Sequence, residues 1–164
     1  MPRIISKTVY QIDEHPNKSA VFEWIRNNWY DLGYFALEDA TESLKLFAKY
    51  IGATVDYRLY IVPDRGEFVS FKFSSVPSLG HVMTYLDLSG NCPFTGCSYD
   101  EVILDSFRVA SSNATTDLEE VLRDVEYRVL KVMHLEGEYI YSDEGLFDCC
   151  DVNGYEFYES GEIA

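Results

Sequence analysis

The sequence predicts an α+β fold, in which clustered helices pack on an antiparallel sheet within a single domain, residues 1–164. Apolar residues recur at helical spacing in several segments, and two neighbouring segments alternate with a period of two around a turn. Helices and strands are also grouped, whereas a doubly wound fold would alternate them. A chain of 164 residues can bury a sizeable core without a disulfide or a metal.

The first fifty residues favour one strand followed by two helices. Residues 7–13 alternate and are rich in β-branched side chains, which indicates a short strand. Apolar residues at helical spacing predict a helix over 17–29 and a second one over 37–51. Gly52 stands where a helix C-terminus expects a glycine.

A β-hairpin is predicted next. Residues 54–62 and 67–73 alternate between apolar and polar side chains, and Pro63-Asp-Arg-Gly66 has the composition of a tight turn. Residues 74–80 are predicted to form a loop. Residues 81–88 fit either a strand or a short helix, and their composition favours a strand.

Two capping boxes are predicted to open the next helices. Ser98 with Glu101 precedes a helix that reaches about Val109, and Thr116 with Glu119 precedes a longer helix that reaches about Met133.

The last thirty residues are predicted to fold despite their charge. Residues 136–141 are strand-like, and Ser142 caps a helix that ends at Asn153-Gly154. Residues 155–163 indicate a terminal strand or hairpin. Six aromatic side chains lie in this segment, and a solvated acidic tail would be poor in aromatics.

The net charge is concentrated in one half of the chain. Residues 1–80 contain 9 Lys/Arg and 10 Asp/Glu, whereas residues 81–164 contain 4 Lys/Arg and 18 Asp/Glu. The first half is therefore near neutrality at −1 and the second carries −14, which sums to the −15 of the whole chain. Direct binding of DNA or RNA is disfavoured, because phosphate contacts require Lys and Arg.

The composition also bears on location. Met1–Lys7 lacks the apolar core of a signal peptide, and no run of 18 apolar residues predicts a membrane span. An anionic surface would be repelled by acidic lipids. With four cysteines and no secretory signal, the expected compartment is a reducing cytoplasm.

A zinc-stabilised module or metal-dependent enzyme is one alternative function. Cys92 and Cys97 have a C-x4-C spacing that tetrahedral zinc accepts, but buried free thiols explain the cysteines more simply. No phosphate-binding glycine loop, nucleophile elbow or nuclease-type Glu-x-Lys is present. The sequence therefore predicts no catalytic residue, cofactor or enzymatic activity.

The leading hypothesis is that the acidic half binds the basic, nucleic-acid-binding surface of another protein. The carboxylates predicted to make this contact are Asp117, Glu120, Asp124, Glu136, Glu138, Asp143, Glu144, Asp148, Asp151, Glu156 and Glu159. The competing interpretation is a domain that is acidic for solubility alone, although such a domain would spread its charge more evenly. A further alternative is an adaptor that binds through Trp24 and Trp29, although their helical spacing favours core packing.

Four segments resemble parts of small acidic proteins carried by phages and integrative elements. They are residues 15–29 (HPNKSAVFEWIRNNW), 62–68 (VPDRGEF), 141–146 (YSDEGL) and 153–157 (NGYEF). Such proteins include anti-restriction and anti-CRISPR factors, several of which mimic DNA. The resemblance implies a non-enzymatic inhibitor of a defence complex in the cytoplasm of a bacterial host, and it implies no particular site residue.

Overall fold

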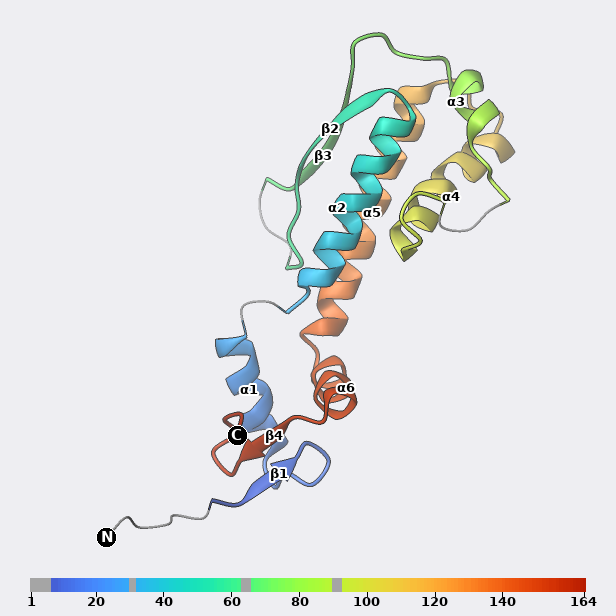
Figure 1. Cartoon of the computed structure of the whole chain (residues 1–164). Coiled ribbons are helices and arrows are strands. Elements are labelled where there is room, and N and C mark those ends of the chain that lie inside the picture. The colour runs from blue at the N-terminus through green and yellow to red at the C-terminus, as the bar shows by residue number, and fades with distance from the viewer. Residues whose placement is uncertain (1–6, 30–31, 63–65, 90–92) are drawn as a thin grey trace. The chain divides into compact units, whose positions relative to one another are not determined.

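The computed structural model describes residues 7–29, 32–62, 66–89 and 93–164, and it confirms the α+β class. The elements are β1 (Val9–Gln11), α1 (Lys18–Asn28), α2 (Tyr34–Tyr50), β2 (Ala53–Arg58), β3 (Phe68–Phe73), α3 (Leu79–Tyr85), α4 (Ser98–Ser112), α5 (Leu118–Ile140), α6 (Asp143–Asn153) and β4 (Glu156–Tyr158) (Figure 1). They form two compact units. Unit 1 comprises Met1–Leu32 and Glu138–Ala164, and unit 2 comprises Gly33–Gly137. Each unit contains one antiparallel pair of strands.

Unit 1 is formed by both ends of the chain. β1 pairs with β4 in the register Tyr10↔Phe157, and Phe157 also bridges Ile163, which confirms the predicted terminal hairpin. Gly161 has a φ of +89°, which suits the turn of this hairpin. The core of unit 1 consists of Ile12, Val21, Phe22, Ile25, Leu146, Cys150 and Phe157.

His15 joins these two ends through its imidazole ring. Its Nδ1 accepts the backbone N–H of Asn17 at 3.0 Å, so its Nε2–H donates to the backbone oxygen of Tyr158 at 2.9 Å. Asn17 in turn caps α1, since its side-chain oxygen accepts the N–H of Ala20. The only buried histidine of the described chain is thus structural.

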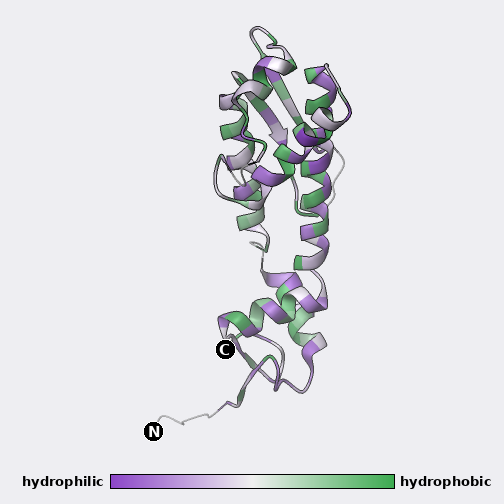
Figure 2. Cartoon of the chain, turned by 90° about the vertical axis from the view of Figure 1, so that its right-hand side faces the viewer, coloured by the Kyte–Doolittle hydropathy of each residue, from purple (hydrophilic) through white to green (hydrophobic). Residues whose placement is uncertain are grey.

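Unit 2 packs helices against the predicted hairpin. β2 and β3 pair from Ala53↔Phe73 to Arg58↔Phe68. Phe47 of α2 lies at the centre of the core, with ring contacts of 5.4–5.6 Å to Phe71, Phe94 and Phe107. α5 contributes a buried face along its length, and Figure 2 shows apolar and polar residues alternating along the helices, as amphipathic packing requires.

The prediction of a strand over 81–88 is wrong, because these residues lie mostly in α3. Ser78 caps this helix by accepting the N–H of His81 at 3.2 Å. Leu79, Val82 and Leu86 are buried at helical spacing. The β-branched composition suggested a strand, but burial of this apolar stripe outweighs a weak local propensity.

The predicted strand over 136–141 is also wrong, since α5 continues to Ile140. Gly137 disfavours a helix by about 1 kcal/mol relative to alanine. In the structure this glycine is buried, and a Cβ at this position would lie 2.0 Å from the backbone oxygen of Ile61. Close packing therefore explains a glycine inside the helix.

Neither predicted capping box forms. Cys97 occupies the N-cap position of α4 without a side-chain bond, and Glu101 pairs with Arg108. At the start of α5, the side chain of Asp117 accepts the N–H of Glu119 at 2.9 Å. Aspartate thus does the capping that the sequence assigned to Thr116.

Candidate partner-binding surface

The exposed face of α6 carries three of the predicted carboxylates. Glu144, Asp148 and Asp151 follow one another at i, i+4 and i+7, so they share one side of the helix, opposite the buried Leu146 and Cys150. The helix begins as predicted, because the Ser142 hydroxyl accepts the N–H of Gly145 at 3.0 Å. It ends at Gly154, which has a left-handed φ of 62°.

Two carboxylates near this face have intramolecular partners. Asp143 lies 2.5 Å from Arg26, in a surface ion pair of the kind that contributes about 0–1 kcal/mol. Asp148 accepts a hydrogen bond of 2.5 Å from the Tyr139 hydroxyl, and this bond is the main cause that raises the pKa of Tyr139. Glu144 and Asp151 make no ion pair or hydrogen bond with any other described side chain.

The rest of unit 1 adds to this negative surface. The predicted residues Glu138, Glu156 and Glu159 are all exposed. The described residues of unit 1 hold eleven Asp/Glu against three Lys/Arg. Lys7 and Lys18 lie over the rings of Tyr158 and Phe147, at 4.4 and 4.9 Å. We call the exposed carboxylates of residues 138–159 the unit 1 acidic surface.

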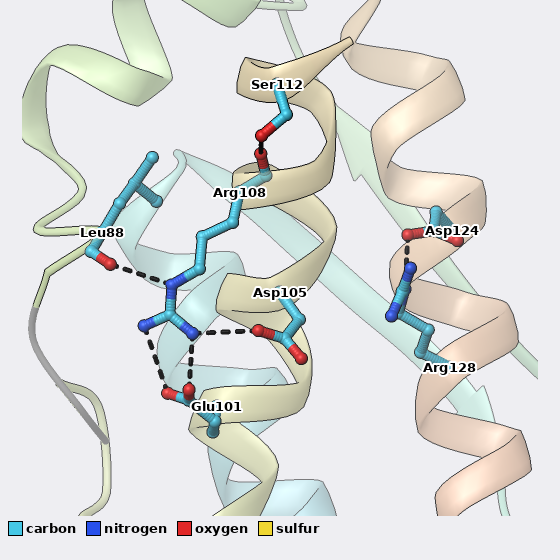
Figure 3. Close-up of polar contacts among 7 residues, drawn as sticks. All are labelled: Leu88, Glu101, Asp105, Arg108, Ser112, Asp124 and Arg128. Atoms are coloured by element: carbon cyan, nitrogen blue, oxygen red, sulfur yellow. Dashed lines mark hydrogen bonds and ion pairs between the residues drawn. The ribbon is translucent and has the colours of Figure 1, made fainter.

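The remaining four predicted residues belong to unit 2 and have mostly local roles. Asp117 caps α5, and Asp124 pairs with Arg128 at 2.6 Å (Figure 3). Glu136 accepts a hydrogen bond of 2.7 Å from the buried Tyr99, and the pKa of Tyr99 is raised by burial and then by this bond. Glu120 is exposed. The predicted set is therefore divided between the two units.

Arg108 neutralises part of the acidic half inside unit 2. Its guanidinium lies 2.5 Å from Glu101 and 2.9 Å from Asp105, and it donates to the backbone oxygen of Leu88 (Figure 3). This arginine therefore joins α4 to the segment that follows α3. No comparable cation exists between residues 138 and 164.

Asp100 is the titratable residue that sequence reasoning missed. Its carboxylate is fully buried and accepts hydrogen bonds from the Ser43 hydroxyl at 2.7 Å and from the Thr95 hydroxyl at 3.0 Å. It also accepts the backbone N–H groups of Phe94, Thr95 and Gly96 at 2.7–3.1 Å. Burial alone would raise its pKa, but these bonds to the charged form hold the pKa below its ordinary value. The sequence feature that could have identified Asp100 is the turn-rich loop just before it, because the backbone N–H groups of such a loop need hydrogen-bond acceptors.

The zinc hypothesis falls partly outside the described residues, because Cys92 is one of those not described. Cys97, Cys149 and Cys150 are free thiols. Within the described ranges, no three His, Cys, Asp or Glu side chains are grouped to hold a metal ion.

Cys150 is expected to resist thiol reagents in the folded protein. It is fully buried in unit 1, and burial raises its pKa to about 12, so the reactive thiolate is scarce at neutral pH. In a Cys149→Ser variant, alkylation mapped by mass spectrometry should modify Cys97 well before Cys150. Urea should abolish the difference; equal rates without urea would contradict the burial.

Both tryptophans contact the core of unit 1. Trp24 and Trp29 are partly buried against it, and the Trp29 ring meets Tyr155 edge to face at 5.0 Å. Their packing accounts for the helical spacing that the sequence showed. The adaptor hypothesis gains no support from this arrangement.

None of the described helices is long and apolar enough to span a membrane. Comparison of the chain with protein-family models, curated proteins and solved structures found no match.

Proposed function

We propose that this protein is a non-enzymatic inhibitor that binds the basic, nucleic-acid-binding surface of a bacterial defence complex. One observation supports the proposal above the others: the seven predicted carboxylates of residues 138–159 are all exposed, in a segment without Lys, Arg or His. Carboxylates on a folded surface attract a Lys/Arg-lined groove as phosphates do, with release of counterions.

Glu144, Asp148 and Asp151, which share one side of α6 and which we call the α6 stripe, are the best-defined part of the unit 1 acidic surface. Residues i, i+4 and i+7 of a helix are spaced by roughly 6 and 4.5 Å along its axis, so the three carboxylates form a short row of closely spaced negative charges. Glu144 and Asp151 have no internal partner among the described residues, so they are available to a partner's cations. The hydroxyl of Tyr139 orients Asp148 between them.

Charge reversal of the stripe should weaken binding without unfolding unit 1. We expect the triple variant Glu144→Lys, Asp148→Lys and Asp151→Lys to lose affinity by roughly tenfold or more, because favourable charge pairs become repulsive. The measurement is recovery of a nucleoprotein complex from nuclease-treated bacterial lysate, eluted in a salt gradient and competed with DNA. Circular dichroism should match the parent, since all three side chains are exposed.

The matched control is Asp13→Lys, Glu14→Lys and Glu23→Lys. These are also exposed carboxylates of unit 1, and the change in net charge is the same. If both variants lose affinity equally, total charge matters and the stripe does not. If neither variant changes the elution, or if DNA does not compete, the proposed function is wrong.

A further inference from the structure

β3 leaves an unpaired strand edge in unit 2. Its sheet has two strands in the part of the chain that the structure describes, and β2 is the strand that packs along α2. Figure 1 shows the hairpin at one side of the unit. The outer edge of β3 therefore presents backbone N–H and C=O groups that an extended segment can pair with.

An apolar groove lies between β3 and the first turns of α5. It has a volume of about 270 Å³, and its apolar lining consists of Phe71, Phe73, Val76 and Leu122. Val76 is 56% exposed and the two phenylalanines are half-buried, so the floor is open to a ligand. A strand added to β3 would lie about 4.8 Å from it, with every second side chain facing this groove.

Three charged residues of α5 complete the lining: Glu119, Arg123 and Glu126. The Arg123 side chain donates to the backbone oxygen of Glu119 at 3.3 Å and to neither carboxylate. Neither Glu119 nor Glu126 forms an ion pair or a side-chain hydrogen bond in the described structure. Glu126 is partly buried, and that burial raises its pKa, whereas the nearby charge of Arg123 opposes the shift only in part. The two glutamates leave the lining with one net negative charge, which a further cation would balance.

We propose that this edge and groove bind an extended segment of a partner protein, added as a strand to β3, with an apolar side chain flanked by Lys or Arg at alternate positions. The apolar side chain would contact Val76 and the half-buried Phe73, and the cations would reach Glu119 and Glu126. These two glutamates are about 10 Å apart along α5, and strand residues four apart are separated by about 13 Å. Lys and Arg side chains are long and flexible enough to make up the difference between these two spacings. The surface lies in unit 2 and is independent of the function proposed above.

Charge favours such a partner over a second copy of this chain. Each copy carries −15, and β3 itself contains one cation, Lys72, which already pairs with Asp56 at 2.9 Å. Pairing two copies edge to edge would bring like charges together. A basic segment instead complements the two glutamates.

The probe is a fluorescein-labelled peptide, Thr-Lys-Thr-Val-Thr-Lys-Thr, with both ends blocked. Its Lys, Val and Lys side chains share one face when it is extended. Fluorescence anisotropy with the full chain should show saturable binding at concentrations up to about 1 mM, the weak end of specific recognition. The same peptide with Glu in place of Lys should not bind, and hydrogen exchange of the β3 amides should slow on binding.

Two variants locate the site. The double variant Glu119→Gln with Glu126→Gln should weaken peptide binding at least fivefold. The single variant Val76→Arg should abolish it. Both variants should fold, because none of these side chains lies in a closed core. The α6 triple-lysine variant should bind the peptide as the parent does, which separates this test from that of the proposed function. Absence of binding, or binding unchanged in both groove variants, would overturn the proposal. So would a concentration-dependent dimer that Val76→Arg dissociates, because the occupant would then be a second copy.

Discussion

Replacing Asp100 with alanine should destabilise the protein by about 3 kcal/mol or more, because several hydrogen-bond donors lose their acceptor and each one left unsatisfied in a buried site costs about 1–3 kcal/mol. The substitution removes the acceptor for two hydroxyl and three backbone N–H groups, of which the Ser43 hydroxyl is fully buried and the others are partly buried. Ser43 lies on α2 and Asp100 on α4, so the substitution also removes a hydrogen bond between these two helices. Urea unfolding followed by circular dichroism at the helix band measures the change.

Asp100 also makes stability depend on pH. Because its pKa in the folded state lies below the ordinary value of 3.8, its contribution is present above that value and is lost as pH falls through the lower folded pKa. An Asp100→Asn variant should lose this acid-side dependence while keeping the side-chain volume. The parent and the variant should therefore differ most near neutral pH.

Asp105→Asn is the matched control for both measurements. Asp105 lies on the same helix but is partly exposed, in an i,i+3 pair with Arg108. Its loss should cost less than about 1 kcal/mol, as is typical of surface pairs. Equal effects at the two positions would mean that the hydrogen bonds to Asp100 are not the source of its stability.

Gly137→Ala should also be strongly destabilising, although alanine is the better helix former by about 1 kcal/mol. A Cβ at residue 137 would lie 2.0 Å from the backbone oxygen of Ile61 and 3.0 Å from a methyl group of its side chain. Backbone atoms cannot rotate away, so α5 and the segment at Ile61 must separate. Overpacking of this kind costs about 1–3 kcal/mol or more, which we expect as a lower urea midpoint.

Gly80→Ala in α3 tests the same change without the contact. A Cβ at residue 80 would meet nothing within 4 Å, and its backbone has no positive φ. Alanine should therefore stabilise the protein by up to about 1 kcal/mol. If both substitutions raise the urea midpoint, helix propensity dominates and the close approach at Ile61 is unimportant.

The features predicted from the sequence are those specified by neighbouring residues. Ser142 caps its helix as predicted, and the alternation before and after residue 63 corresponds to the β2–β3 pair. The α+β class followed from these local patterns. The carboxylates of α6 that the partner-binding hypothesis names are exposed, as that hypothesis requires.

The errors arose where distant contacts override local preference. A strand was predicted over 136–141, but these residues continue α5, and the missing Cβ of Gly137 permits the helix to pass Ile61, which is far away in the sequence. Val82 and Thr84 suggested a strand, but burial of Leu79 and Val82 favours a helix. The role of Asp100 as a buried hydrogen-bond acceptor was not predicted, although the residue lies within the predicted Ser98–Glu101 capping box. Its donors come from a loop and from α2. Contacts of this kind leave little trace in a single sequence.

The hydrogen bond between His15 and Tyr158 joins residues 143 positions apart. Unit 2 is one continuous stretch, whereas unit 1 requires both ends of the chain. On the ribosome, residues 33–137 are complete while β1 and α1 still lack β4 and α6. Closing so long a loop also costs more entropy than a local contact. Both tryptophans of the chain lie in α1 or at its end. Tryptophan fluorescence therefore follows the folding of unit 1, which comes last, and does not follow the folding of unit 2.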